Sequence, residues 1–331
     1  MPIQWFPGHM NVTKKAIIER IKDTDVVIEL LDARLPGSSA NPMLEQLTGH
    51  RLKLKVLNKQ DLADATQTEA WLAWYNAQPN TRAIALDAGE TAPAQRLIKA
   101  CRELAPHRGG MAKPLRVMIC GIPNVGKSTL MNTLVGRKAA KTGDEAGVTR
   151  VEQRINLASD FYLFDTPGML WPKITVDQSG YHLAASGAVG RNAYEDEDVS
   201  LELLKSLREP YAAQLAARFK LDDVAAIPTT DEEVLLSEVG RKRGAVMSGG
   251  RINIAKAAEI VLHDFRAGLI GRITLETPEQ FAQWWAEGQA KEAEREAAKL
   301  ARKQKKHGSR KPADADADVD DDEEEDESDE G

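Results

Sequence analysis

The sequence lacks long hydrophobic runs, has only two cysteines and contains few aromatic residues. No apolar stretch approaches the roughly 18 residues that a transmembrane helix needs, so we expect no membrane-spanning segment. The first ten residues, MPIQWFPGHM, have neither the charged and apolar regions of a secretory signal nor the Arg- and Ser-rich composition of a transit peptide. These absences predict a cytoplasmic protein.

The scarcity of cysteine and of aromatic residues limits the class of protein further. Cys101 and Cys120 each lie in an apolar segment, and two such cysteines do not indicate a disulfide framework. No cluster of cysteine and histidine has the spacing of a metal site. Aromatic residues make up 5% of the chain and hydrophobic residues 42%, so we expect a core built mostly of Leu, Ile, Val and Ala.

The formal net charge of −7 hides an uneven distribution of charged residues. Residues 312–331 hold 13 of the 51 acidic residues and no Lys or Arg, so the remainder has 44 basic and 38 acidic residues, a net charge of +6. A basic stretch at 299–311 precedes this acidic block. Charged blocks are usually disordered and often serve as interaction tails, although a tail that only improves solubility fits equally well.

Short apolar runs alternate with helical stretches between residues 25 and 166. We predict strands at 25–33, 54–61 (running into a loop), 81–88, 115–121, 151–158 and 161–166. We predict helices at 41–49, 67–77, 92–104 and from about Lys127. Near-continuous apolar strands between helices indicate a mainly parallel sheet covered on both faces, whereas the alternation at 151–158 is typical of an edge or antiparallel strand.

The character of the sequence changes after about residue 176. Stretches at 199–219, 230–244 and 252–268 have helical spacing broken by Pro and Gly, which predicts an all-helical domain. Residues 278–306 begin amphipathic and become almost entirely charged, as in a helix that frays into a tail. The predicted organisation is a first domain at 1–175, a helical domain at 176–290 and a disordered basic-then-acidic tail at 291–331.

The most specific motif is GIPNVGKS at 121–128, which matches the P-loop pattern G-x-x-x-x-G-K-[ST]. It lies between a predicted strand and a predicted helix, as a phosphate-binding loop must. Its glycines let backbone N–H groups point at phosphate oxygens, Lys127 can reach the β- and γ-phosphates, and the Ser128 hydroxyl can hold Mg²⁺. The residues expected to contact nucleotide here are Asn124, Val125, Gly126, Lys127, Ser128 and Thr129.

The tetrapeptide NKQD at 58–61 indicates which base is bound. It follows a predicted strand, and open α/β sheets bind ligands at the carboxyl ends of their strands. The Asp61 carboxylate can accept hydrogen bonds from N1–H and the exocyclic amine of guanine, whereas adenine would leave it unpaired at a cost on the order of a few kcal/mol. We expect Asn58 to bond the base or to tie neighbouring loops together, and the stem of Lys59 to pack on the ring.

The segment DTPG at 165–168 supplies the expected contacts to the metal and to the last phosphate. Asp165 ends a predicted strand and is placed to hold Mg²⁺ through a water molecule. The Gly168 N–H can bond the γ-phosphate, so this loop can distinguish GTP from GDP.

Two weaker signals complete the predicted site. Thr149 lies between the P-loop helix and the next strand, and we expect its hydroxyl to close over Mg²⁺, with Thr142 as the alternative. Asp87 and Ala88 come after the apolar run TRAIAL at 81–86 and fit a purine-contacting loop, although an ordinary turn fits as well.

The motifs occur in an unusual order along the chain. In a Ras-like GTPase the P-loop comes first and NKxD fourth, whereas here NKQD at 58 precedes the P-loop at 121 and DTPG at 165 ends the domain. A Ras-like sheet cut after the DxxG strand, with its former ends joined near 105–114, keeps the same strand contacts. We therefore predict an α/β fold: a circularly permuted Ras-like P-loop GTPase domain followed by a smaller all-α domain. The chain runs from the DTPG loop directly into this all-α domain.

The permuted order, WFPGHM at 5–10 and DTPGMLWPK at 165–173 together resemble the bacterial YlqF/RbgA family of ribosome biogenesis GTPases, over about residues 1–285. The resemblance implies a role in late assembly of the large ribosomal subunit, with GTP hydrolysis stimulated by the subunit precursor. It implies that the helical domain contacts rRNA and that ribosomal proteins are partners. We expect a monomer that binds neither DNA nor membranes.

The residues themselves support rRNA binding only in part. Basic residues Arg241, Lys242, Arg243 and Arg251 fit phosphate contacts, but they fit solvated helix faces equally well. No RNP- or KH-type signature is present, and few aromatic residues can stack on bases. The alternative is a GTPase switch that acts through protein partners without direct rRNA contact. An ATPase is disfavoured by Asp61, and a tRNA-modification or transport GTPase by the lack of a membrane segment or cofactor motif.

Hydrolysis requires a polar group that the DTPG segment does not supply. Ras-like enzymes use a Gln directly after DxxG to orient water, and Met169 at that position cannot do so. His9 is the candidate, because an imidazole titrates near neutrality and the family resemblance also points to this residue. A lone histidine near a terminus is otherwise structural or exposed. The expected catalytic residues are His9, Lys127 and Thr149.

Asn124 is a second unusual feature of the P-loop. In several related GTPases an Asn at this position helps to hold K⁺, which supplies charge where an arginine finger would. By this analogy we expect K⁺ to stimulate hydrolysis, the alternative being that Asn124 only stabilises the loop. Arg150 and Arg154 lie near the switch segment but show no clear geometry for an arginine finger. The expected ligands are GTP or GDP, Mg²⁺ on Ser128, Thr149 and Asp165, and K⁺ on Asn124.

Overall fold

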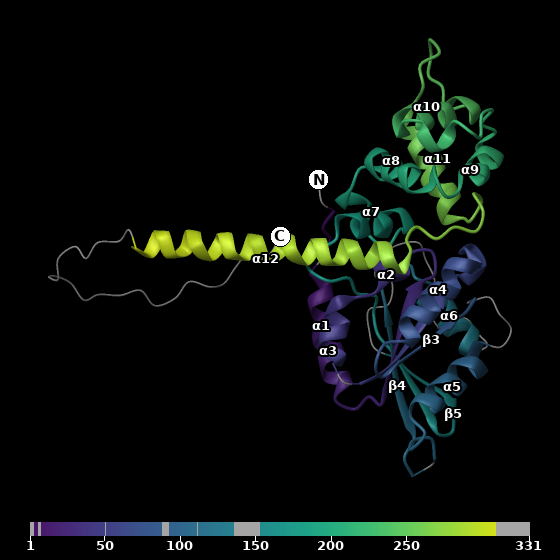
Figure 1. Cartoon of the computed structure of the whole chain (residues 1–331). Helices are drawn as coiled ribbons and strands as arrows, with labels where there is room; N and C mark the ends of the chain where they lie inside the picture. Colours follow the sequence, from purple (N-terminus) through teal and green to yellow (C-terminus); the bar gives the residue numbers. More distant parts are fainter. Residues whose placement is uncertain are drawn as a thin grey trace. The chain divides into compact units, whose positions relative to one another are not determined.

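The computed structural model describes residues 3–5, 8–49, 51–87, 93–110, 112–135 and 153–308 of the chain. The chain divides into two compact units, Met1–Gly288 and Gln289–Gly331, and the division falls inside the last helix, α12 (Pro278–Gly308). The first unit contains a sheet and the helices packed on it (Figure 1). None of the helices in the described ranges combines the length and the apolar character that crossing a bilayer requires.

Six strands form one sheet in the order β3-β2-β1-β4-β6-β5. The strands are β1 (Val26–Asp32), β2 (Leu52–Asn58), β3 (Thr81–Ala85), β4 (Leu115–Gly121), β5 (Gln153–Ala158) and β6 (Phe161–Asp165). Neighbouring strands of this sheet pair in parallel except β5 and β6, which are antiparallel, and β5 lies at an edge. The predictions of a mainly parallel sheet and of an edge or antiparallel strand before the DTPG strand are confirmed.

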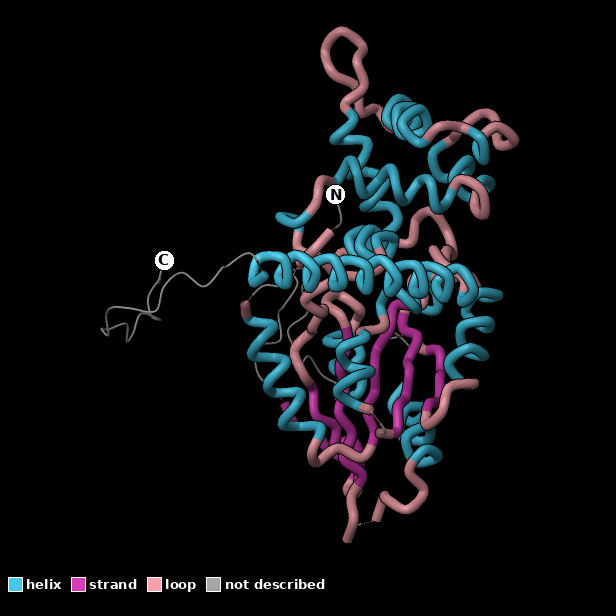
Figure 2. Tube along the Cα trace, turned by 60° about the vertical axis from the view of Figure 1, so that its left-hand side comes forward, coloured by secondary structure: helices cyan, strands magenta, loops and turns pink. Residues whose placement is uncertain are grey.

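Helices cover both faces of the sheet (Figure 2). On the described chain, α5 (Pro93–Leu104) contacts α6 (Lys127–Val135), and α4 (Ala65–Asn76) packs on β3. Near the amino end of the chain, α1 (His9–Ile21) contacts α3 (Pro42–Thr48). The central strand β1 is buried along its whole length, as its almost uninterrupted apolar sequence predicts for a strand covered on both faces.

The strand pairing shows the circular permutation directly. The chain enters the sheet at β1, and Val26 pairs with Leu52 of β2 on one side and with Val117 of β4 on the other. The P-loop strand β4 is reached only after β2 and β3, and the strand that carries DTPG, β6, pairs with β4. The strand contacts that bring the nucleotide motifs to one end of the sheet are therefore kept in the new order, and the predicted permuted fold is confirmed.

The helices that follow β6 agree with the sequence pattern. The predicted stretch 199–219 divides at Pro210 into α8 (Asp196–Leu207) and α9 (Ala212–Phe219), because proline cannot continue a helix. The two later stretches form α10 (Glu232–Lys242) and α11 (Ile254–Arg266).

Helix α7 (Asp177–Ser186) was missed by the sequence reasoning, as was α1. Most of α7 is buried, so it has no one-sided apolar stripe that would reveal a helix in the sequence. It also contains Gly180, where an added Cβ would lie 3.3 Å from the Cβ of Ile3. Close tertiary packing, rather than local preference, determines this helix.

A buried polar cluster joins α2 (Pro36–Ser39) to α7 and to the segment before α12. The Glu276 carboxylate accepts hydrogen bonds from the Ser38 backbone N–H at 2.6 Å and the Ser38 hydroxyl at 2.5 Å, and it lies 2.9 Å from Nδ1 of His182. These residue types also make up hydrolytic triads. Because none of the three is more than 4% exposed, no substrate could reach them and their role is structural.

Candidate nucleotide-binding site

The P-loop connects the end of β4 at Gly121 to the start of α6 at Lys127. The backbone takes positive φ at Asn124 (56°) and at Gly126 (96°), which turns the loop sharply. A Cβ added at Gly126 would lie 2.4 Å from the side-chain nitrogen of Asn58. Glycine is therefore required at 126 both by the backbone angle and by the close approach of the NKQD segment.

The NKQD segment is hydrogen-bonded to the P-loop. Asn58 is completely buried and donates from Nδ2 to the Val125 carbonyl at 2.8 Å. Lys59 donates from Nζ to the Asn124 carbonyl, also at 2.8 Å. Of the two roles that the sequence left open for Asn58, the structure shows the one that ties neighbouring loops together.

Asp32, at the end of β1, holds Lys59 from the other side and was not among the predicted site residues. Its carboxylate accepts a hydrogen bond from Lys59 Nζ at 2.8 Å and is paired with Arg34 at 2.8 Å. Burial alone would raise the pKa of Asp32, but the charges of Arg34 and Lys59 outweigh it and hold the pKa well below its usual range. The available signal was a carboxylate at the last position of an apolar strand, VVIELLD, whose other acid is Glu29.

The P-loop lysine and the aspartate of DTPG lie next to each other. Lys127 Nζ is 2.5 Å from the Asp165 carboxylate, and the two residues are 6% and 1% exposed. Burial raises the pKa of Asp165, and the Lys127 charge opposes this shift without cancelling it. At the same helix start, Ser128 is half-buried and Thr129 exposed. A hydroxyl, a carboxylate and a lysine thus meet at the amino end of α6, where a helix favours bound anions.

The DTPG loop lies against the P-loop. A Cβ added at Gly168 would come within 3.2 Å of the backbone of Pro123, and the Met169 N–H donates to the Gly121 carbonyl at 3.1 Å. The Met169 side chain is 1% exposed, so it is a core residue and not a group that could orient water. The Gly168 backbone is thereby placed beside the phosphate-binding loop.

The base-selecting end of the site is formed after β2 and β3. Asp61 is exposed, on the short helix η1 (Gln60–Leu62), and Asp87 is half-buried beyond the end of β3. The Gln60 N–H donates to the Leu86 carbonyl at 3.3 Å and so joins the two loops. The predicted purine-contacting residues therefore lie on connected segments at the carboxyl edge of the sheet.

The residue types and one unsatisfied atom fit a guanine nucleotide with Mg²⁺. The Asn58 Oδ1 atom is buried and has no hydrogen-bond partner among the described residues, although a buried acceptor normally has one. The Ser128 hydroxyl and the Asp165 carboxylate are the hard oxygen ligands that Mg²⁺ prefers. Asp61 remains available for a base that offers two donors.

Some predicted residues fall outside the described part of the chain. Thr149, its alternative Thr142, Arg150 and Ala88 all belong to ranges that the structure leaves undescribed. The backbone of His9 begins α1, but its side chain is not described either.

Comparison with known proteins agrees with this geometry. Residues 116–232 match a family model described as a 50S ribosome-binding GTPase. A protein of Bacillus cereus named ribosome biogenesis GTPase A is 39% identical over 290 residues, which cover 86% of this chain and 96% of that protein. A protein of the same name from Priestia megaterium is 39% identical over 291 residues, covering 86% and 99%. The chain belongs to the ribosome biogenesis GTPase A family.

The fold of this family member also matches a solved structure. GNP-bound YlqF from T. maritima superposes with a TM-score of 0.57 at 24% identity, covering 81% of this chain and 98% of that one. At this identity the likeness concerns the fold alone, and it agrees with the permuted strand order described above.

In this member of the ribosome biogenesis GTPase A family, the P-loop directly contacts the helices that follow the sheet. Asn124 donates from Nδ2 to the Gly187 carbonyl at 2.8 Å, and Gly187 caps the carboxyl end of α7. Arg266 of α11 donates to the Ala184 and Ala185 carbonyls, both at 2.9 Å. The end of α7 is thus held between the phosphate-binding loop and α11, a contact that no local sequence pattern indicates.

Arg34 makes a second link between the GTPase motifs and the helices of this family member. It is 2% exposed, donates from Nη1 to the Phe265 carbonyl at 3.0 Å and stacks over the Phe265 ring at 4.7 Å. The same guanidinium pairs with Asp32, which holds Lys59. One chain of contacts therefore runs from the NKQD lysine to α11.

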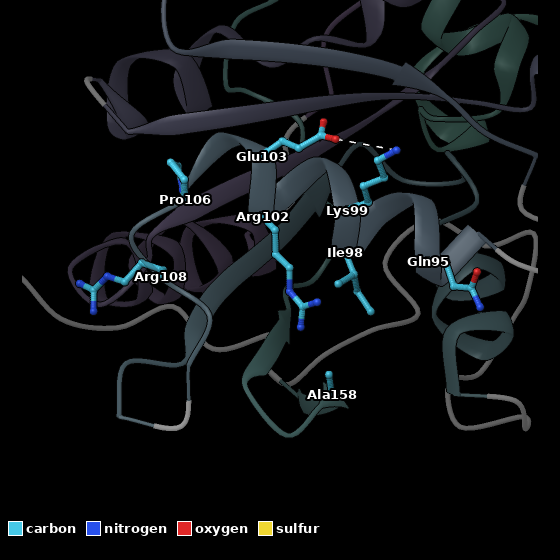
Figure 3. Close-up of a pocket in the computed structure, with 8 residues that line it drawn as sticks. All are labelled: Gln95, Ile98, Lys99, Arg102, Glu103, Pro106, Arg108 and Ala158. Carbon is cyan, nitrogen blue, oxygen red and sulfur yellow. Dashed lines mark ion pairs between the residues drawn. The ribbon is translucent and has the colours of Figure 1, made fainter.

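A groove of about 740 Å³ lies away from these motifs, between α5 and the strand β5 (Figure 3). It is lined by Gln95, Ile98, Lys99, Arg102, Glu103, Pro106, Arg108 and Ala158. Arg102 pairs with Asp160 at 2.8 Å and Arg108 with Asp25 at 3.1 Å. Arg108 and Asp25 precede the strands β4 and β1, so the groove belongs to the amino end of the sheet and not to the nucleotide site.

Proposed function

We propose that this chain binds GTP with Mg²⁺, hydrolyses GTP to GDP and phosphate, and acts as a switch in late assembly of the large ribosomal subunit. The observation that carries the enzymatic part is the pair of hydrogen bonds from Asn58 and Lys59 to the P-loop carbonyls. These bonds support the proposal because they join the NKQD segment to the P-loop despite the reversed order of the motifs. The ribosomal part rests on the names of relatives at 39% identity.

Each residue of the site has a distinct proposed role. Lys127, bonded here to Asp165, would instead bond the phosphate oxygens of a bound nucleotide, and Ser128, Asp165 and Thr149 would hold Mg²⁺. Mg²⁺, when bound, neutralises charge on the phosphates. Asp61 accepts both guanine donors, Lys59 packs on the ring and Asp87 with Ala88 borders it. Val125, Gly126, Thr129 and Gly168 contact phosphates through the backbone or side chain.

Binding assays with the full chain test the nucleotide assignment. Wild-type protein should bind GDP far more tightly than ADP, and Lys127→Ala and Asp61→Ala should each weaken GDP binding strongly. Lys15→Ala and Glu69→Ala replace exposed residues of the same charges on α1 and α4, so they should bind GDP as the wild type does. Equal affinity for GDP and ADP, or unchanged binding in the first two variants, would overturn the assignment.

His9 is the proposed group that orients or deprotonates the attacking water. The burial of Met169 removes the position used for this purpose in Ras-like enzymes. His9→Ala should bind GTP normally and lose about 10²- to 10⁴-fold in turnover stimulated by ribosomal particles, as expected for loss of a general base. Full stimulated turnover in this variant would remove the proposal.

Asn124 is the proposed ligand for K⁺, which would supply positive charge next to the phosphates. Support comes from the position of Asn124 at the tip of the P-loop and from the analogy with related GTPases. Turnover should be faster in K⁺ than in Na⁺ at equal ionic strength, and Asn124→Ala should abolish the difference. Equal wild-type rates in the two salts would count against a K⁺ site.

We propose that residues 1–175 act as the GTPase domain, 176–290 as the rRNA-contacting domain and 291–331 as a charged tail. The full chain should co-sediment with large-subunit particles when a non-hydrolysable GTP analogue is present. The competing function, a switch that acts only through protein partners, predicts no binding to rRNA stripped of protein. Turnover measured with and without large subunits in K⁺ buffer tests the proposed stimulation.

A further inference from the structure

The helices that follow the sheet are acidic as a whole but contain one local cluster of basic residues. Residues 177–288 contain 18 acidic and 12 basic residues, a net charge of −6. Acidic residues concentrate at the starts of helices, at 195–198 and 231–233. Four of the basic residues instead line a single pocket, so their grouping does not reflect the overall charge of this part of the chain.

The pocket is a concavity of about 380 Å³ built from distant segments of the chain. It is lined by Arg191, Arg218, Arg243, Lys256, Glu259, Ile260, His263 and Asp264. Arg191 begins the short helix η2 (Arg191–Ala193), and Arg218 belongs to α9. Arg243 caps the carboxyl end of α10, and Lys256 belongs to α11. Packing of the helices, rather than a run of basic residues in the sequence, creates the cluster.

A buried carboxylate organises the floor of this pocket. Asp264 is 2% exposed and accepts a hydrogen bond from Arg218 Nε at 2.7 Å. Arg243 Nη2 lies 3.8 Å away and His263 Nδ1 3.2 Å away. Burial would raise the pKa of Asp264, but hydrogen bonds from Arg218 and His263 and the charge of Arg243 outweigh burial and lower this pKa. The Asp264 carboxylate therefore stays ionised and anchors the two arginines.

The anchoring leaves hydrogen-bonding capacity for a ligand. The bond to Asp264 uses one of the five N–H donors of the Arg218 guanidinium. At the rim, the Arg191 and Lys256 side chains are 69% and 58% exposed, and they pair with Asp196 at 3.3 Å and Glu259 at 2.8 Å. Counting the lining residues, four Lys or Arg face two carboxylates, a net charge of +2 before any contribution from His263.

We propose that this pocket binds a phosphate group of an RNA backbone, an inference that rests on the proposed contact with rRNA and assigns it to a site. Oriented guanidinium groups match phosphate oxygens, and phosphate contacts supply much of the affinity for nucleic acid. No Phe, Tyr or Trp lines the pocket, and its lining is dominated by charged groups that suit a phosphate better than a base. The pocket therefore positions the chain on RNA without reading sequence.

Lys256 and Lys205 provide a matched pair for testing this inference. Lys256 pairs with Glu259 at 2.8 Å and Lys205 with Glu202 at 3.4 Å, each three residues apart on a helix and each with more than half of its side chain exposed. Only Lys256 lines the pocket. Lys256→Glu should weaken binding of the full chain to protein-free rRNA from large subunits by about tenfold and reduce its dependence on salt by about one ion. Lys205→Glu should stay within about twofold of the wild type in both measurements.

The possible results separate the pocket from the broader function. If wild-type protein binds neither large-subunit particles nor rRNA, the proposed rRNA contact itself is wrong. If the wild type binds rRNA and both lysine variants bind it equally well with the same salt dependence, the pocket assignment is wrong. Competition identifies the ligand chemistry. Polyuridylate should displace the rRNA from this pocket. Displacement by polyglutamate at equal charge would instead identify a carboxylate site and overturn the assignment to phosphate. GDP affinity should be unchanged in both variants.

Discussion

At the residue scale, the nucleotide site depends on a few side chains whose partners are far away in sequence. Lys59 is shared between Asp32 and the Asn124 carbonyl, and each contact is 2.8 Å long. Asn58 contacts Val125, and its Oδ1 atom is buried and finds no partner in the part of the chain that the structure describes. The two loops of the site are therefore positioned by buried polar contacts, for which small changes in side-chain chemistry have large effects.

The Asp61 carboxylate should determine the base through its acceptor-only character. In Asp61→Asn, one acceptor becomes a donor, which matches the carbonyl at position 2 of xanthine and no longer matches the amine of guanine. We expect the variant to lose at least about a hundredfold in GDP affinity and to bind xanthosine diphosphate more tightly than GDP. Titration of both nucleotides measures this. An unchanged preference for GDP would show that another residue reads the base.

Asp32 should act as a positioning residue for the NKQD lysine. Asp32→Asn keeps the shape but weakens the hold on Lys59, so we expect GDP affinity to fall about tenfold, or about 1.4 kcal/mol. Asp23→Asn replaces an exposed carboxylate near the other end of β1 and should bind GDP normally. Circular dichroism must show that both variants are folded. Normal GDP affinity in folded Asp32→Asn would contradict the proposed positioning.

The lowered pKa of Asp32 also predicts how stability depends on pH. A carboxylate with a lower pKa in the folded state contributes stability above its unfolded pKa of about 4, and this contribution is lost as the pH falls below it. The free energy of unfolding of the wild type should therefore drop between about pH 4 and pH 2. In Asp32→Asn the drop should be smaller, as measured by urea unfolding at a series of pH values. An equally steep drop would mean that other carboxylates account for it.

At the scale of elements, the carboxyl end of α7 is the junction between the P-loop and the helices. The last carbonyls of a helix have no partner within the helix and attract positive charge. Arg266 satisfies those of Ala184 and Ala185 and also donates to the Tyr194 hydroxyl at 3.0 Å. Asn124 satisfies that of Gly187. A helix that appears featureless in the sequence thus gains its stability from two distant side chains.

Removing the Arg266 guanidinium should destabilise this junction. Arg266→Met keeps much of the aliphatic stem but leaves the buried Ala185 carbonyl without its partner, whereas the Ala184 carbonyl keeps its bond from the Gly187 N–H. We therefore expect the free energy of unfolding to fall by about 1 to 3 kcal/mol. Arg241→Met replaces an exposed arginine of α10 and should change it by less than about 0.5 kcal/mol. Chemical denaturation of the three proteins provides the comparison. Equal stability of the two variants would show that water replaces the lost hydrogen bonds.

At the scale of the whole molecule, two routes connect the nucleotide motifs to the helices after residue 176. One is the short connection from DTPG to α7, which follows from the permuted order of the chain. The other consists of the contacts Asn124–Gly187 and Arg34–Phe265. We therefore expect a ligand that moves the P-loop or the DTPG loop to act on α7 and α11 through both routes.

Hydrogen exchange should show this coupling. With a non-hydrolysable GTP analogue instead of GDP, we expect slower exchange in α7 and α11, because the γ-phosphate orders the DTPG loop that leads into them. Helix α5, which contacts the P-loop helix α6 but is not connected to the DTPG loop along the chain, serves as the internal reference. Identical exchange over residues 177–266 in the two nucleotide states would exclude transmission to these helices.

The sequence by itself determined the secondary structure of the sheet, the motifs and their permuted order, and through them the family. These features are local: each depends on the spacing of a few residues, as in GIPNVGKS, NKQD and DTPG, or on the period of apolar residues along one strand. For the same reason the edge strand β5 and the division at Pro210 could be predicted.

Only the tertiary structure decided which distant groups meet. Helix α7 has no amphipathic stripe, Asp32 is one of two acids in a predicted apolar strand, and Asp264 is one of 18 acids between residues 177 and 288. Their roles arise because folding buries a charge and thereby requires a specific partner, Lys59 for Asp32 and Arg218 for Asp264. Such pairings depend on the packing of whole helices and strands, and no local spacing in the chain encodes them.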